Sequence, residues 1–168
     1  MVTAFVRDER AGNWEQVRRV NEAAFGRSDE ADLVDNLRAS GDVLLSLVAE
    51  SEDLVVGHIL FSRMAIETAH GNVGAVALAP LAVLPDHQRR GIGSRLILCG
   101  LDRLSDCGER IVIVLGHEHY YPRFGFSPRK ACDLASPFPP EAFMALELAP
   151  SALDGVRGKV RYPVAFGL

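Results

Sequence analysis

The stretch "QRRGIGSRL" at residues 88–96 puts two glycines and three arginines between a hydrophobic run and an amphipathic segment. The run before it, residues 71–85, is typical of a buried strand, and apolar residues recur at helical spacing from 92 to about 106. Glycines let the backbone approach a bulky group, because they lack a Cβ atom, and a helix that begins there points unpaired N–H groups at an anion. The junction therefore predicts a strand, an anion-binding loop and a helix.

The charges beside the glycines favour a phosphate as the anion. Arg89 and Arg90 add positive potential to the helix dipole, and Ser94 adds a hydroxyl donor. A glycine-containing helix start with solvated arginines explains the same residues equally well. A Walker A loop needs G-x-x-x-x-G-K-[ST], which does not occur, and a dinucleotide fingerprint needs glycine where Leu96 stands. If the stretch binds pyrophosphate, it does so by another motif.

Hydrophobic periodicity along the rest of the chain predicts a mixed sheet with helices on its faces. Two amphipathic helices are expected at 13–25 and 28–40, the second with Ser28 as its N-cap. A short helical segment is expected at 117–126. Strands are expected at 3–9, 42–50, 54–67, 71–85, 110–116, 143–148 and 158–166.

Length and composition favour a single domain over residues 1–168, with a core from about 3 to 148 and a C-terminal strand segment at 149–168. The net charge of −4 gives no general affinity for polyanions, so no nucleic-acid partner is expected. With no apolar run of membrane-spanning length and a charged N-terminus, the chain is expected to be cytoplasmic, with no membrane partner.

The hydrophobic strand segment "FMALEL" at 143–148 shows an alternation that places Met144, Leu146 and Leu148 toward the core. The three cysteines of the chain are odd in number and lack the spacing of metal ligands. They predict reduced thiols that are mostly buried, and no metal site.

Pro80 lies inside the strand expected at 71–85. Proline cannot donate a hydrogen bond to a sheet, so it indicates an edge, a bulge or a place where two strands part. If the strands part, the backbone groups of Leu81 and Val83 become available to a ligand. A plain edge strand is the alternative interpretation.

Three motifs resemble the GNAT N-acetyltransferase superfamily. "QRRGIG" at 88–93 matches that family's Q/R-x-x-G-x-G/A loop for acetyl-coenzyme A, and "LAVLP" at 81–85 stands where the family has its splayed fourth strand. "YYPRFGF" at 120–126 is similar to the family's Tyr-x-x-hydrophobic-Gly-Phe element after the fifth strand. With "VLGHEHYYPRFGF" and "FMALEL", the chain resembles a small bacterial branch of predicted acetyltransferases, and the order of elements matches the family along residues 1 to about 148.

The resemblance implies an α/β (α+β) fold with a mixed, mostly antiparallel sheet of about seven strands, a V-shaped splay between strands 4 and 5, and helices on both faces. It implies acetyl-CoA as co-substrate, no metal, and direct transfer of an acetyl group to an amine of a small molecule or protein in a ternary complex. The chain is expected to be a monomer or a homodimer. The implied cofactor-binding residues are Leu81, Ala82, Val83, Gln88, Arg89, Arg90, Gly91, Ile92, Gly93, Ser94 and Tyr121.

Acyl transfer from a thioester to an amine makes three chemical demands. The carbonyl needs a donor where negative charge develops, for which the Leu81 N–H is the candidate. The amine must be neutral to attack. For a lysine-like amine with a pKa of about 10.4, deprotonation at pH 7 costs roughly 4–5 kcal/mol. A base or a water chain must therefore take the proton. The leaving thiolate needs a proton, and motif alignment places Tyr121 there as the general acid.

Both side-chain assignments keep alternatives. The two tyrosines could serve packing alone. Tyr120 could also replace Tyr121 as the acid. Pro122, directly after Tyr121, departs from the commoner sequence of the family motif, which leaves the exact hydroxyl position open. Glu30 is the favoured base or acceptor-site residue, since the region between the first two helices borders the acceptor site in the family, and a water-mediated base is equally reasonable. The other candidate bases are Glu22, His58, His117, Glu118 and His119.

Two further classes of function are compatible with the sequence. One is a non-catalytic module of the same fold that binds coenzyme A as a sensor or partner. The other is a different enzyme with a phosphate ligand, such as a nucleotide hydrolase, against which the missing Walker lysine argues.

Overall fold

A computed structural model describes residues 3–168. The helices are α1 (Trp14–Phe25), α2 (Asp29–Ser40) and α3 (Ile92–Asp106). Within this described range the strands are β1 (Phe5–Asp8), β2 (Val43–Ser51), β3 (Leu54–Thr68), β4 (Gly71–Val83), β5 (Ile111–Leu115), β6 (Leu134–Ala135), β7 (Phe143–Glu147) and β8 (Gly158–Arg161). No helix among residues 3–168 is both long and apolar enough to span a membrane.

The strands form one mixed sheet with the order β1-β2-β3-β4-β5-β7, and β8 pairs with β3 and β6. The pair β4–β5 is parallel, while β1–β2, β3–β8 and β5–β7 are antiparallel. The predicted mixed, mostly antiparallel sheet is confirmed. It has eight strands over the described residues rather than about seven, because the two-residue strand β6 is too short to leave a periodic pattern.

The pairing between β4 and β5 ends before Pro80. It joins Val76–Leu78 to Val112–Val114, whereas β4 itself continues through Pro80 to Val83. Proline has no N–H to offer a neighbouring strand, so the ladder stops where the sequence predicts that the strands part.

Two compact units divide the chain. One comprises Met1–Phe61 and Pro80–Gly100, and the other comprises Ser62–Ala79 and Leu101–Leu168. The expectation of a single domain over residues 1–168 stays a prediction.

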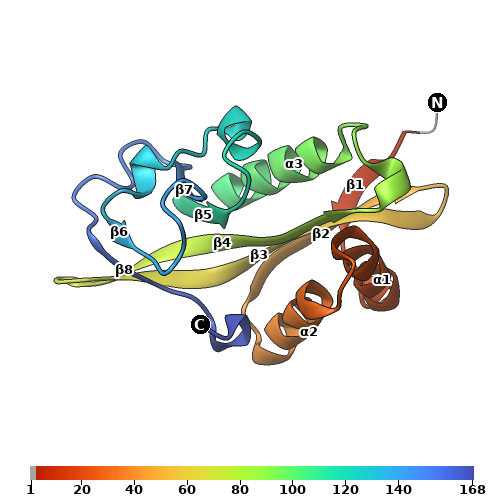
Figure 1. The fold of residues 1–168 in the computed structure, drawn as a ribbon, viewed down its shortest axis with the longest axis horizontal. Coiled ribbons are helices and arrows are strands. Elements are labelled where there is room, and N and C mark those ends of the chain that lie inside the picture. Colours follow the sequence, from red (N-terminus) through yellow and green to blue (C-terminus); the bar gives the residue numbers. More distant parts are fainter. Residues whose placement is uncertain (1–2) are drawn as a thin grey trace. The chain divides into compact units, whose positions relative to one another are not determined.

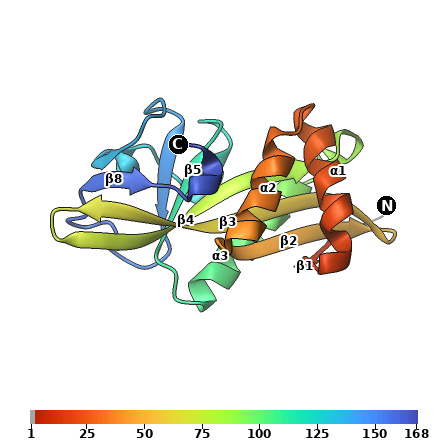
Figure 2. The same cartoon turned by 90° about the horizontal axis from the view of Figure 1, so that it is seen from below.

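In the first unit, helices cover both faces of the strands (Figures 1 and 2). His58 on β3 contacts Asn21 of α1, with 3.1 Å between His58 Nδ1 and Asn21 Nδ2. The neighbouring Gly57 faces α3, since a Cβ atom there would lie 3.0 Å from Ile92 Cγ2. Adjacent residues of a strand point to opposite faces, so α1 with α2 and the first part of α3 lie on opposite sides of β3.

In the second unit, β7 is buried on both faces. It pairs with β5 from Ile111 to Leu115, and Ala145 also forms a bridge with Ser127. Phe138 packs against the side of Phe143, with ring centroids 6.5 Å apart. Residues 143–146 are all buried: Met144 and Leu146 lie in the core as predicted, and Phe143 and Ala145 on the opposite face are buried as well. Leu148 is only half-buried. The aromatic cover over the second face comes from a loop that the local alternation does not reveal.

Two expected elements near the C-terminus differ from the structure. The strand expected at 158–166 ends at Arg161, because Pro163 interrupts it and a 3₁₀ turn follows at Val164–Phe166. The helical segment expected at 117–126 is only a short 3₁₀ turn, Tyr121–Phe124, which ends at Gly125 with a φ of 98°. The segment from Pro122 to Gly125 has too few residues to form an α-helix.

Two smaller expectations hold only in part. Ser28 stands at the N-cap of α2, but its backbone is helical (φ −92°, ψ −12°) and its hydroxyl makes no capping hydrogen bond, because a side-chain cap needs an extended residue. All three cysteines are free, as expected, but exposed rather than buried. In α3 the buried stripe is occupied by Leu96, Ile97 and Leu101, which leaves Cys99 on the solvent side.

Candidate active site

The loop between β4 and α3 is closed by Gln88. After β4 the chain makes a 3₁₀ turn, Pro85–His87, and the Gln88 side chain then donates from Nε2 to the carbonyl of Val83 at 2.9 Å. This bond ties the loop back to the end of β4. The first residue of the glycine motif therefore has a structural task, independent of any ligand.

Two residues of the loop have left-handed backbone. Gly91 has a φ of 79°, and Arg89 has a φ of 61°, a conformation that residues with a Cβ rarely adopt. The first helical bond recorded after the turn runs from the N–H of Arg95 to the carbonyl of Gly91, at 3.1 Å. The N–H groups of Ile92 and Gly93 precede that bond and so have no acceptor within the helix.

The surroundings of the loop fit an anionic group. Apart from Gly91 and its two chain neighbours, no atom of residues 3–168 lies within 4 Å of the place where a Cβ of Gly91 would stand, and the side chains of Arg89 and Arg90 are exposed. Ile92 is buried and packs toward Gly57, which anchors the start of α3. Open space at Gly91, which follows two exposed arginines in the sequence and immediately precedes α3, is a suitable place for a phosphate.

All of the residues predicted for the coenzyme A loop lie in the first unit, along one continuous strand, loop and helix. Ala82 is buried, and Leu81 and Val83 are half-buried. Tyr121 lies in the second unit. The roles assigned to these residues stay predictions.

Tyr121 begins the 3₁₀ turn after β5 and is 8% exposed. Its ring makes edge-to-face contacts with Tyr120 and Phe126, with centroids 5.2 Å and 5.8 Å away. Burial, with a smaller effect of Tyr120, raises the pKa of Tyr121 well above its ordinary value. The hydroxyl is protonated throughout the neutral range, as a proton donor must be, but the raised pKa also makes it a weaker acid than an ordinary tyrosine.

Tyr120 has a different environment from its neighbour. The guanidinium of Arg123 lies over the Tyr120 ring at 4.7 Å from its centroid, and Arg123 Nε donates to the Tyr120 carbonyl at 3.4 Å. Phe124 packs edge-to-face on the same ring, at 5.4 Å. The pair "YY" therefore contains one buried tyrosine and one that is partly covered by a cation.

The favoured base, Glu30, is held in an ion pair with Arg27. Arg27 Nε lies 3.1 Å from both carboxylate oxygens, and a second nitrogen makes a shorter contact. This pairing lowers the pKa of Glu30, although partial burial opposes the effect. A carboxylate with a lowered pKa holds a proton weakly, which makes Glu30 a poorer base at neutral pH.

Of the other candidate bases, His58 is fully buried. Its Nδ1 lies 3.1 Å from Asn21 Nδ2 and its Nε2 lies 2.9 Å from Ser46 Oγ. Burial, and next the charge of Arg38, lowers the pKa of His58 to about 3. It is a neutral structural group at pH 7.

The remaining candidate bases lie on the surface. Glu22 pairs with Arg18 at 2.9 Å, and His119 Nε2 lies 3.3 Å from Glu118 Oε1. His117 is also exposed. Among residues 3–168, no group of three or more His, Cys, Asp and Glu side chains is arranged to hold a metal ion.

The family model of the GNAT acetyltransferase domain matches residues 6–129, which is well over half of the chain. The chain belongs to the GNAT acetyltransferase family. This assignment agrees with the order β4, glycine loop, α3 and β5, in which β4 and β5 are parallel. It confirms the family resemblance that was inferred from the three sequence motifs.

Two curated relatives of this GNAT protein come from Escherichia coli (strain K12). The uncharacterized N-acetyltransferase YjhQ is 46% identical over 114 residues, which cover 67% of this chain and 63% of YjhQ. The chain thus spans less than two thirds of that relative. The uncharacterized N-acetyltransferase YhbS is 37% identical over 142 residues, which cover 83% of this chain and 84% of YhbS.

Two solved structures of GNAT proteins are close to this one in fold. The crystal structure of Escherichia coli YhbS in complex with CoA has a TM-score of 0.93 and 32% identity, covering 100% of this chain and 94% of that one. A GNAT family acetyltransferase from Brucella melitensis in complex with acetyl-CoA has a TM-score of 0.82 and 37% identity, covering 97% of each chain.

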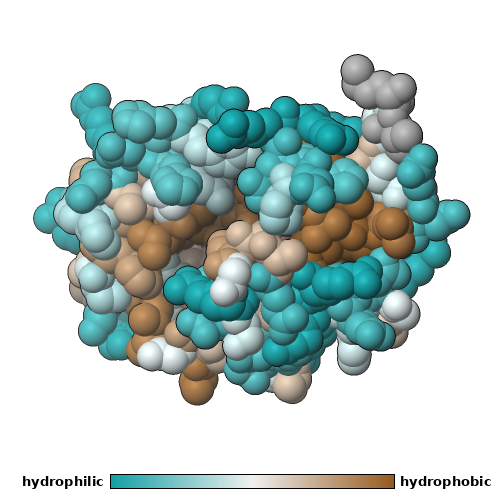
Figure 3. Space-filling view, turned by 45° about the vertical axis from the view of Figure 1, so that its right-hand side comes forward, coloured by the Kyte–Doolittle hydropathy of each residue, from teal (hydrophilic) through white to brown (hydrophobic). Residues whose placement is uncertain are grey.

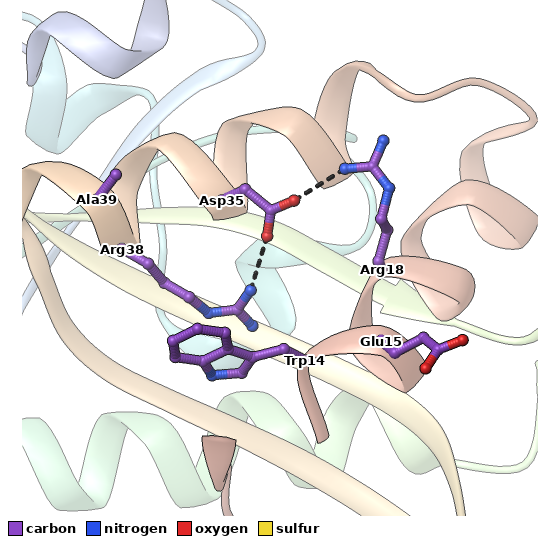
Figure 4. A pocket seen from close by; sticks show the side chains of 6 residues that line it. All are labelled: Trp14, Glu15, Arg18, Asp35, Arg38 and Ala39. Atoms are coloured by element: carbon purple, nitrogen blue, oxygen red, sulfur yellow. Dashed lines mark hydrogen bonds and ion pairs between the residues drawn. The ribbon is translucent and has the colours of Figure 1, made fainter. Parts of the chain in front are cut away.

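A surface hollow of this GNAT protein lies in the first unit, between the start of α1 and the end of α2 (Figure 4). Arg38 lies over the Trp14 ring, 5.0 Å from its centroid, and pairs with Asp35 at 2.9 Å and with Glu9. Arg18 also binds Asp35, at 2.8 Å. No predicted site residue lines this hollow, and its Arg18, Asp35 and Arg38 side chains are held in ion pairs.

Hydrophobic side chains are also exposed at separate places on the surface. Figure 3 shows one face, on which hydrophobic residues gather in patches within a largely hydrophilic surface. The large exposed side chains of the described residues are Phe5, Trp14, Phe25, Leu54, Leu98, Leu115, Val164 and Leu168. They come from several elements, with Trp14 and Phe25 at the two ends of α1, and none of them is a predicted site residue.

Sequence reasoning missed two features beside the predicted residues of this GNAT protein. One is the hydrogen-bonded group of Asn21, Ser46 and His58. The sequence held a signal for it: Asn21 is a polar residue on the buried face of α1, four residues after Val17. The other is Gly116, which lies against the ring of Tyr121. No local pattern indicates that contact.

Proposed function

We propose that this GNAT protein is an acetyl-CoA-dependent N-acetyltransferase that acts by direct transfer in a ternary complex. The nitrogen of the acceptor amine attacks the thioester carbonyl, the C–S bond breaks, an amide forms, and coenzyme A leaves as its thiol. The acceptor is an amine of a small molecule or a protein.

The observation that carries this proposal is the loop between β4 and α3. Its left-handed Gly91 stands in open space beside Arg89, Arg90 and the N-terminus of α3. We assign the backbone and side chains of residues 88–94 to the pyrophosphate of coenzyme A, and the backbone of residues 81–83 to the rest of the donor. The complexes of the two similar structures with CoA and acetyl-CoA support this assignment.

Three groups of this chain are assigned to the chemistry. The Leu81 N–H stabilises the negative charge that develops on the thioester oxygen. The Tyr121 hydroxyl protonates the leaving thiolate. Because the Arg27 pair lowers the pKa of Glu30, we assign removal of the amine proton to a water chain rather than to this carboxylate.

The activity is tested by incubating the protein with acetyl-CoA and a panel of amines, with thiol release followed by a thiol-trapping dye. The exposed Cys99, Cys107 and Cys132 also react with such a dye, so protein without acetyl-CoA is the blank. Thiol release well beyond the protein concentration, with the acetylated amine seen by mass spectrometry, supports the proposal. Coenzyme A binding without turnover would instead favour a sensor module, and absence of both contradicts the family function for this chain.

The loop assignment predicts that Gly91→Ala and Gly93→Val weaken coenzyme A binding. Alanine at a φ of 79° is strained by about 1–2 kcal/mol, and the loop of the free protein can relax to relieve this strain. Restoring the binding conformation should then raise the Kd of Gly91→Ala by up to roughly tenfold. Valine at position 93 should obstruct the donor itself. Calorimetric titration with coenzyme A measures both effects.

Gly12→Ala is the matched control for these variants, because Gly12 lies in the same unit, in open space and without left-handed backbone. Its Kd should equal that of the unaltered protein. An unchanged Kd in a folded Gly93→Val protein would show that the donor binds elsewhere.

A further inference from the structure

Gly116 lies directly against the ring of Tyr121. It follows β5, and its N–H donates to the carbonyl of Ala142 at 3.0 Å, which fixes this part of the backbone. A Cβ atom at position 116 would lie 2.2 Å from Tyr121 Cε2, 2.7 Å from Cδ2 and 3.2 Å from Cζ. Any residue other than glycine therefore overlaps the ring.

The backbone at position 116 does not itself require glycine. Its φ lies outside the left-handed region, unlike that of Gly125 in the same segment. An alanine could adopt the same backbone, so the overlap with Tyr121 is the specific consequence of a side chain here.

The ring has little room to move away. Tyr121 is 8% exposed, with Tyr120 and Phe126 in edge-to-face contact around it. Its N–H donates to the carbonyl of His117 at 3.4 Å. A buried ring held in this way cannot absorb an added atom as a flexible surface side chain would.

We propose that Gly116 is a positioning residue for the Tyr121 hydroxyl, and that its missing side chain creates the space that the ring needs. This inference rests on the proposed role of Tyr121 as proton donor. Ordinary Cβ contacts begin at 3.4 Å, so an alanine at 116 must displace the ring by about 1 Å. A misplacement of about 1 Å in a catalytic group can lower a rate about 10²-fold.

The test compares Gly116→Ala with Gly74→Ala. Gly74 belongs to the same unit, has nothing within 4 Å of its Cβ place and is not left-handed. Gly116→Ala should lower kcat about 10²-fold with the Kd of acetyl-CoA unchanged, and Gly74→Ala should leave both unchanged. Full turnover by Gly116→Ala, where Tyr121→Phe has lost it, overturns the inference and leaves the proposed function intact.

The double variant separates positioning from a general structural effect. If Gly116 acts only through the Tyr121 hydroxyl, Gly116→Ala should cause no further loss in a chain that already carries Tyr121→Phe. Losses that multiply overturn the positioning role.

A readout without turnover uses protein with ¹³C-labelled tyrosine rings. The Tyr121 signal is identified by its loss in Tyr121→Phe. It should shift in Gly116→Ala and stay in place in Gly74→Ala. An unmoved signal overturns the inference even if no amine is acetylated, whereas a shifted signal in a protein without acyl transfer overturns the proposed function alone.

If Gly116→Ala unfolds at a lower temperature, relief of the overlap provides the test. Tyr121→Ala removes the ring that the added Cβ overlaps. In a chain that already carries Tyr121→Ala, Gly116→Ala should therefore lower the midpoint of thermal unfolding by less than it does in the unaltered protein. Absence of this coupling overturns the proposed contact.

Discussion

Replacing Tyr121 with phenylalanine should lower kcat by about 10²–10⁴-fold, the usual contribution of a general acid, while the Kd of coenzyme A stays nearly unchanged. The substitution removes only the hydroxyl and keeps the ring, so the edge-to-face contacts with Tyr120 and Phe126 remain. Because burial raises the pKa of Tyr121, the hydroxyl carries its proton at every pH at which the enzyme would be assayed near neutrality. Steady-state kinetics with a good acceptor, together with calorimetry, measure the two quantities.

Tyr120→Phe is the matched control for this prediction. Its ring touches that of Tyr121 but is only half-buried and lies under Arg123, so loss of its hydroxyl should leave kcat nearly unchanged. If Tyr120→Phe lost turnover and Tyr121→Phe did not, the proton donor would be the first tyrosine of the pair. If neither variant lost turnover, the thiolate would leave without help from a side chain.

Acid should destabilise the protein strongly through His58. Its pKa is lowered from 6.5 to about 3 by burial, so the folded protein keeps His58 neutral while the unfolded chain takes up a proton. The contribution to folding stability is complete above pH 6.5 and is lost as the pH falls toward 3. A difference of this size corresponds to as much as about 5 kcal/mol, a large part of the stability of an ordinary domain.

Urea unfolding between pH 7.5 and pH 4 tests this prediction by comparing the unaltered protein with His58→Gln. The variant should be less stable at pH 7.5, because Asn21 and Ser46 lose their partner, but its free energy of unfolding should depend less on pH. His119→Gln is the control, since His119 is exposed and should leave the slope unchanged. Equal slopes in the unaltered protein and in His58→Gln would assign the acid sensitivity to other groups.

The sequence by itself determined most of the local elements. The helices expected at 13–25 and 28–40 lie within a residue of α1 and α2, because their apolar spacing is a local property of each segment. The buried stripe of α3, with Leu96, Ile97, Leu101 and Leu104, was readable for the same reason. The motif resemblance likewise identified the family, since the loop at 88–93 is a short continuous stretch.

The tertiary structure decided what depends on residues far apart in the chain. The face of β7 that carries Phe143 and Ala145 is buried in a cluster with Ala131 and Phe138, which lie outside the alternating segment. Burial, and next the charge of Arg38, lowers the pKa of His58 and keeps it neutral, and its partners Asn21 and Ser46 come from two other elements. Hydrophobic periodicity reports which side of an element faces inward, but not which group it meets there.

The same distinction holds within the candidate site. Position and composition alone indicated the glycines and arginines at 88–94 as an anion loop, because a helix N-terminus and its neighbours carry their dipole and charge locally. Only the folded chain shows that Gly116 leaves room for the ring of Tyr121, since that requires the turn at Tyr121–Phe124 to bring the ring back onto the end of β5. A glycine after a strand has many uses, and the sequence cannot show which atom occupies the space that its missing side chain leaves.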